Sequence, residues 1–189
     1  MEPLTREKII EMVGSGKSLE GTDLSRADLS YSDLKSGIFK KADMNHVQLQ
    51  NANLEKADLS GANLENAFLF GANLKGANLK GASLKGANLQ DTNLEAANLE
   101  GTNLSQLSLF GAQMDGANLE GADITGAKLK RASLVGAKLK NADLSGAHCQ
   151  RAVFRKADLT GAKLEGTNLT NADMEHAIVD ESALKAAHR

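Results

Sequence analysis

The fold is decided by a stretch in which the same five-residue pattern returns without interruption. Residues 72–90 read ANLKGANLKGASLKGANLQ, so leucine recurs at every fifth position, with alanine two residues before it and glycine two residues after it. Stepping outward by fives reaches Leu19 in one direction and Leu184 in the other. Every position visited is apolar when Cys149 is counted as a small hydrophobe. Because no insertion breaks this register, the chain is a repeat array.

A five-residue period fits neither of the regular secondary structures. An α-helix turns about 100° per residue, so leucines five apart would spread around all its sides. In a straight strand, residues two apart share a face, but a step of five changes the face. The pattern works if the chain turns a corner in every pentad, because each short extended segment then points its alanine and leucine inward. Glycine has the backbone freedom for such a corner, and 15 of the 18 glycines occupy that position. We therefore predict a β-solenoid whose turns hydrogen-bond to one another.

The repeat also carries a recognisable motif. Segments such as Ala57-Asp58-Leu59 and Ala77-Asn78-Leu79 resemble the A-(D/N)-L-X-X motif of the pentapeptide-repeat family, and the resemblance covers residues 17–184. It implies a right-handed quadrilateral β-helix with four pentads in each coil, in which the other three positions of each pentad face solvent. The chain has 34 pentads, which implies about eight coils. At about 4.8 Å between strands, the rod would be about 40 Å long.

The first residues predict a helix that covers the open end of the solenoid. Thr5 is placed to cap the helix, while Ile9, Ile10 and Val13 form an apolar stripe. Glycines then end the helix before residue 17. We therefore expect residues 1–16 to form an N-terminal helical cap and residues 17–184 to form the repeat array.

The last residues predict a second, shorter helix. Asp180 is placed to cap it, and Leu184 lies within it. Residues 185–189 are expected to form a C-terminal tail or cap. We interpret this end as a lid, which makes the chain a monomer; the alternative is a contact in a dimer.

Because four pentads make a coil, residues twenty apart should stack, and the sequence becomes a map of the surface. One face places aromatic residues at outward positions, next to the densest basic cluster of the chain. Exposed aromatic side chains beside Arg and Lys are typical of interface centres. The alternative is that the phenylalanines fold flat over neighbouring coils. We name the candidate protein-binding set the aromatic–basic face: Phe68, Phe70, Phe110, Lys128, Lys130, Arg131, His148 and Arg151.

One residue breaks the inward pattern. Leu107 occupies a position that holds alanine in most pentads. An oversized inward side chain overpacks a close-fitting core. We therefore predict a local distortion at residues 106–108.

The sequence contains no constellation typical of catalysis or of metal or cofactor binding. The four histidines lie far apart, and His148 and Cys149 are neighbours that face opposite sides of a strand. Carboxylates recur at solvent-facing positions without a cleft that would shift their pKa. We expect no enzyme, no metal and no cofactor. The single cysteine, the absence of a signal sequence and the absence of a long apolar run predict a cytoplasmic protein.

These observations favour a non-enzymatic interaction module or regulator that presents a rigid surface to a protein partner. The alternative is a DNA-mimicking rod that binds a type II topoisomerase, as family members linked to quinolone resistance do. A net charge of −2 and interspersed lysines argue against such mimicry. Direct nucleic-acid binding through the cluster from Lys128 to Arg151 is a third hypothesis, which the small number of cations disfavours.

Overall fold

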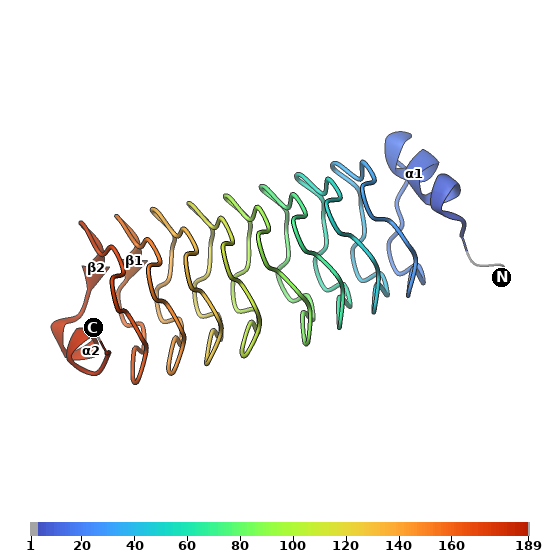
Figure 1. Cartoon of the computed structure of the whole chain (residues 1–189). Coiled ribbons are helices and arrows are strands. Elements are labelled where there is room, and N and C mark those ends of the chain that lie inside the picture. The colour runs from blue at the N-terminus through green and yellow to red at the C-terminus, as the bar shows by residue number, and fades with distance from the viewer. Residues whose placement is uncertain (1–3, 189) are drawn as a thin grey trace.

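The computed structural model describes residues 4–188 and shows a rod of stacked coils with a helix at each end (Figure 1). Along the chain, α1 spans Arg6–Gly14, β1 Asp158–Leu159, β2 Ile178–Val179 and α2 Glu181–Lys185. The two strands pair in parallel, with Asp158 opposite Ile178. Elsewhere the coils are joined by isolated parallel bridges, because each side of a coil is extended over only a few residues.

A uniform hydrogen-bond pattern joins each coil to the next. Leu54 N donates to Asn73 O, and Asn73 N donates to Ala52 O, so Asn53 lies opposite Asn73, twenty residues on. Between the bridges, a tight turn closes every five residues, as where Ala57 N donates to Leu54 O. Four turns in every twenty residues give each coil four sides.

The turns explain why the pentad needs a special residue at its corner. The third residue of each turn has a positive φ, for example 58° at Lys56 and 66° at Gly61. Glycine fills about half of these corners, and its missing Cβ removes the steric penalty of the left-handed region. The other corners hold polar or charged residues, an alanine and Tyr31, and none of them is β-branched.

The predicted inward positions form the core of the rod. The apolar column from Leu19 to Leu169 is buried, including Phe39, Cys149 and Phe154. Threonine replaces alanine at three buried inward positions, Thr92, Thr102 and Thr167, and its hydroxyl donates to a backbone carbonyl there. Thr92 Oγ1, for example, donates to Leu89 O at 2.7 Å, so the buried polar group is satisfied.

Helix α1 packs against the first coil as the apolar stripe predicts. Thr5 Oγ1 accepts a hydrogen bond from Lys8 N at 3.3 Å, and Ile9 and Val13 are buried. The Arg6 guanidinium donates to Asp28 O at 2.9 Å and to Ser30 O at 2.7 Å. Inside the rod, the equivalent carbonyls accept from the preceding coil. Arg6 therefore supplies the donors that this end of the rod would otherwise lack.

The C-terminal end differs in detail from the sequence-based prediction. Asp180 is the N-cap residue of α2, as predicted, but its side chain makes no capping hydrogen bond to that helix. Its carboxylate instead accepts from Gly161 N of the coil beneath at 3.0 Å. Leu184 lies inside α2. The chain then rejoins the ladder, by which we mean the series of parallel bridges between residues twenty apart, with His188 opposite Asn168.

The ladder is open at one place, which we call the seam: the contact between residues 81–87 and residues 100–108. Within residues 4–188, the ladder of twenty-residue pairs lacks one interior bridge, between Ser83 and Asn103. Between the coil that holds Leu107 and the following coil the bonds are intact, since Lys128 N donates to Leu107 O at 2.9 Å. In Figure 1 the coils spread apart along one side of the rod in the green part of the chain.

The seam includes the residues where the distortion is predicted, since Ser108 N lacks its bond to Ala87 O. The bridge between Asn88 and Ser108 is kept, however, and the missing bridge lies at Asn103. Thr102 and Leu107 occupy the alanine positions at the two ends of one side of a coil. The coil before it has alanine at both positions, as does the coil after it. Two oversized inward side chains in one coil hold the preceding coil away on that side.

Candidate protein-binding face

The aromatic–basic face is built from two columns of outward side chains that flank one inward leucine column, and from Arg131 and Arg151 at the corner that follows. Alternation along each extended segment sends the residue before the leucine and the residue after it outward. Bridges between Gln48 and Phe68 and between Lys128 and His148 place successive coils side by side. The column before the leucines holds Phe68, Asn88, Ser108, Lys128 and His148, and the column after them holds Phe70, Gln90, Phe110, Lys130 and Gln150.

The aromatic part of this face is open to solvent. Phe68 is 46% exposed and Phe70 is 42% exposed, while Phe110 is half-buried. Tyr31, 75% exposed, lies at a corner that borders the same face, and sequence reasoning missed it. Counting in steps of twenty residues from Tyr31 reaches Arg131, so the same map of the surface places Tyr31 beside this face. Since the two remaining aromatic residues are core phenylalanines, all outward aromatic side chains of the chain lie on this face or at its border.

A groove of about 560 Å³ runs between the two columns. At one end Gln90 Nε2 donates to Ser108 Oγ at 2.7 Å, and Phe110 lines the wall next to them. At the other end lie basic and amide side chains. The lining residues are Gln90, Ser108, Phe110, Lys128, Lys130, His148 and Gln150.

The basic side chains beside the groove are exposed and lack acidic partners. On other faces, lysines pair with carboxylates one coil away, as Lys75 does with Glu95 at 2.6 Å, and this hydrogen bond raises the pKa of Lys75. No such ion pair forms, among residues 4–188, at Lys128, Lys130, Arg131, His148 or Arg151. The Arg131 guanidinium lies over the Phe110 ring, 5.9 Å from its centroid. This cation–π contact joins the basic cluster to the aromatic one.

The remaining reactive or hollow features have no such arrangement. Cys149 points into the core, and burial raises the pKa of its thiol to about 12, which disfavours the nucleophilic thiolate. His148, its neighbour, is on the outside. Residues 4–188 contain no group of three or more His, Cys, Asp or Glu side chains that would hold a metal ion.

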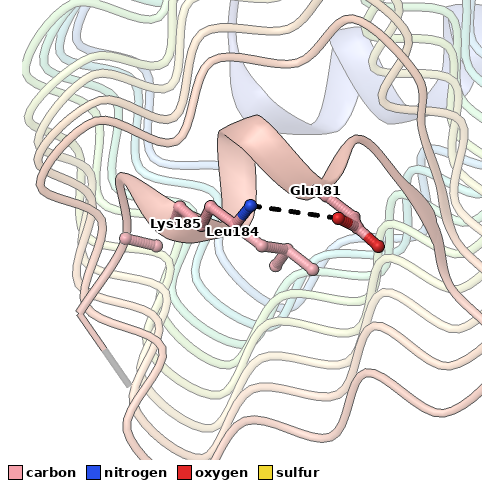
Figure 2. Close-up of a pocket in the computed structure, with 4 residues that line it drawn as sticks. Glu181, Leu184 and Lys185 are labelled. Carbon is pink, nitrogen blue, oxygen red and sulfur yellow. Dashed lines mark ion pairs between the residues drawn. The ribbon is translucent and has the colours of Figure 1, made fainter.

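A second hollow of about 560 Å³ lies at the C-terminal end, beside α2. Figure 2 shows Glu181 and Lys185 on this helix, joined by an ion pair of 4.0 Å, with Leu184 between them. Glu181 and Lys185 are also largely exposed, so the hollow has few buried polar groups to orient a ligand. Neither α1 nor α2, which are the helices among the described residues, has the length and apolarity to cross a membrane.

Comparison with known proteins identifies the repeat. A family model described as pentapeptide repeats matches in eight copies, and the matched ranges include residues 15–40, 67–106, 87–126, 103–141, 137–175 and 147–184. No curated protein sequence matches the chain.

Three solved structures illustrate the similarity. HetL, a pentapeptide repeat protein involved in heterocyst differentiation regulation from the cyanobacterium Nostoc sp. strain PCC 7120, is 36% identical, with a TM-score of 0.64; the match covers 90% of this chain and 76% of HetL. The pentapeptide repeat protein alr5209 from Nostoc PCC 7120 is 34% identical over 53% of this chain and 83% of its own, with a TM-score of 0.47. A trypsin-treated form of QnrB1, a plasmid-mediated fluoroquinolone resistance protein, is 25% identical over 76% of this chain and 77% of its own, with a TM-score of 0.42. The family match over most of the chain and the likeness to HetL show that the chain belongs to the pentapeptide-repeat family, and its fold is the right-handed quadrilateral β-helix of that family.

Proposed function

We propose that the chain is a non-enzymatic interaction module or regulator, which binds a protein partner through the aromatic–basic face. The observation that carries this proposal is the gathering of every outward aromatic side chain on one face or at its border, beside cations without acidic partners. Large aromatic side chains and arginine are the residues that contribute most to binding energy in protein interfaces. A stiff scaffold adds to affinity because little conformational entropy is lost on binding.

The relationship to HetL supports a regulatory role. HetL is described as involved in the regulation of heterocyst differentiation, and it is similar to this chain over most of its length. We infer that this chain too has a regulatory role, and that it acts by binding another protein.

The ends of the rod are proposed to be closed, which leaves its faces for binding. In this proposal the rod has about eight coils at the strand spacing of a β-sheet. Helix α1 covers the first coil with Ile9 and Val13, and Arg6 occupies two of its carbonyls. At the other end, the segment from Asp180 to His188 bonds to the last coil. The protein is then a monomer whose partner docks on the side of the rod.

The proposal is tested by capture of partners from a native lysate. The Phe68→Ser, Phe70→Ser, Phe110→Ser variant should lose a protein that the parent captures, because its exposed aromatic anchors are gone. The matched control is Ile38→Ser with Ile178→Ser, which removes exposed apolar side chains from the opposite face. This control should keep the partner.

Two results would count against the proposed face. Capture of the same partner by the parent and by the triple variant would mean that another surface binds. Capture of a type II topoisomerase by both would favour the DNA-mimic hypothesis instead.

A further inference from the structure

The aromatic–basic face changes in character along the rod axis. Phe68 and Phe70 lie on one coil, and Phe110 lies two coils further on. The cations follow on the next two coils, beginning with Lys128 and Lys130. The groove is lined by Phe110 and by basic side chains, and Phe68 and Phe70 lie beyond its aromatic end, so a ligand that lies in the groove and extends along the face meets both parts.

The basic part carries an uncompensated positive charge. Between Asn88 and Asn171, the outward positions next to the leucine column and at the following corner hold one acidic residue, Asp91. Its carboxylate lies over Gly111, one coil before Arg131, and forms no ion pair with a residue of the cationic coils among residues 4–188. The two cationic coils themselves hold no carboxylate at these positions, and a partner with carboxylates would supply the counter-charge.

The length of the face indicates what kind of ligand fits. Four coil spacings separate the coil of Phe68 from the coil of His148, which is about 19 Å at the spacing of β-strands. An extended polypeptide covers that distance with about six residues. Apart from Ser108 N at the seam, the coil backbones along the groove are already paired with one another, so recognition relies mainly on side chains. Gln90, Ser108 and Gln150 offer groups that can hydrogen-bond to a peptide backbone.

On the basis of the proposed function, we propose that the partner presents an extended acidic segment to this groove. Apolar side chains at one end of the segment contact Phe68, Phe70 and Phe110. Carboxylates at its other end contact Lys128, Lys130 and the neighbouring basic side chains. The segment lies along the rod axis, across the coils.

A polypeptide fits this face better than a nucleic acid does. The basic cluster is confined to two coils, whereas a nucleic acid backbone requires cations along its whole length. The aromatic side chains and the cations also lie on different coils. This separation suits a segment with distinct apolar and acidic ends better than it suits a uniform polyanion.

The test uses a defined probe and the whole chain. The probe is a fluorescein-labelled hexapeptide of phenylalanine, leucine and four glutamates, and its binding is followed by fluorescence anisotropy. Replacing the glutamates with lysines should abolish binding, and replacing the two apolar residues with serines should weaken it. Added salt should weaken the binding of the acidic probe because the ion pairs are exposed.

The chain itself offers a matched pair of variants. Lys128→Glu with Lys130→Glu reverses the charge of the Lys-Leu-Lys segment at the groove. Lys138→Glu with Lys140→Glu reverses the charge of an identical Lys-Leu-Lys segment on the opposite face. All four side chains lie on the outside of the rod, so neither variant disturbs the core. The first variant should weaken probe binding about tenfold or more, while the second should leave it within about twofold of the parent.

Several results would overturn the inference. These are equal loss of probe binding in both charge-reversal variants, tight binding of the lysine probe, and displacement of the probe by a DNA oligonucleotide that binds more tightly. If the captured partner requires the phenylalanines but is retained by Lys128→Glu with Lys130→Glu, the proposed function stands and the acidic-segment inference fails. If capture does not depend on the phenylalanines at all, the proposed function fails first.

Discussion

At the scale of single residues, the repeat depends on one backbone conformation more than on any side chain. Each pentad needs a residue with positive φ at its corner, and about half of these corners do not have glycine. A residue with a Cβ in the left-handed region costs about 1–2 kcal/mol. Placing glycine in a fixed backbone costs about 0.5–1 kcal/mol of conformational entropy relative to alanine. The non-glycine corners are therefore sites where stability can be gained.

The simplest such corner is Ala96, whose φ is 53°. We expect Ala96→Gly to raise the free energy of unfolding by about 0.5 kcal/mol, because the relief of strain exceeds the entropy cost. The adjacent Ala97 is fully buried and lies outside the positive-φ region. Ala97→Gly should lower stability by about 1.5 kcal/mol through the lost methyl group and the added backbone freedom. Urea unfolding of both variants measures the two effects, and a loss of stability in Ala96→Gly would contradict the argument.

The sequence predicts which position of each pentad forms the corner, but glycine alone does not identify every corner residue. Glycine marked the slot, and the unbroken register then assigned the same slot to residues such as Lys56 and Asn66. How side chains stack at the corners is visible only in the structure. Asn66 Oδ1, for example, occupies the space that a Cβ on Gly86 would need. Glycine at that corner therefore leaves room for the asparagine of the preceding coil.

At the scale of one coil, the seam shows how packing strain is released. Replacing a buried leucine with alanine usually costs about 2–5 kcal/mol. At Leu107 the expected result differs, because this leucine fills a slot sized for alanine. Together with Thr102→Ala, Leu107→Ala should let Asn103 N donate to Ala82 O and Ser108 N to Ala87 O, as the equivalent groups do elsewhere in the rod.

We expect the Thr102→Ala, Leu107→Ala variant to lose less than about 1 kcal/mol of stability or to gain some, since each restored backbone bond contributes about 1 kcal/mol. Amide hydrogen exchange at Asn103 and Ser108 should become slower than in the parent. The control is Leu109→Ala in the same coil, which removes a fully buried leucine from a leucine slot and should cost about 2–5 kcal/mol. Equal losses in the two variants would mean that the seam has another cause.

The sequence identified Leu107 as an outlier but did not reveal the shape of the distortion. The sequence does not distinguish Thr102 from Thr92 and Thr167, which occupy the same kind of slot at places where the backbone bonds between coils are complete. A repeat pattern specifies which side chains point inward. It does not specify which of two neighbouring coils gives way, because that depends on how the two oversized residues act together.

At the scale of the whole molecule, the period determines the rod, and the step of twenty determines which residues share a face. The first follows from the periodicity of the amino-acid sequence. The second, and with it the position of the aromatic–basic face, rests on the four-pentad coil that the family resemblance implies. The groove and the lack of ion pairs at its cations depend on side-chain conformations, which the pattern does not determine. At the C-terminal end the periodicity stops, and local geometry directs Asp180 to Gly161 instead of to its own helix.

A rod of stacked coils is quasi-one-dimensional, so the position of a lesion along it matters. Leu99 is fully buried near the middle, in contact with coils on both sides, whereas Met174 in the last coils is partly exposed. Leu99→Lys places an unpaired charge in the core and should lower the free energy of unfolding by several kcal/mol. Met174→Lys should cost about 1 kcal/mol, because its ammonium group can reach water.

Thermal unfolding followed by circular dichroism compares the two variants. Because neighbouring coils stabilise each other, the lesion at Leu99 should also divide the transition, so that the two halves of the rod unfold at different temperatures. The lesion at Met174 should leave a single transition close to that of the parent. A Leu99→Lys protein that melts like the parent would show that this leucine does not point into the core, and the inward assignment of the leucine column would then be wrong.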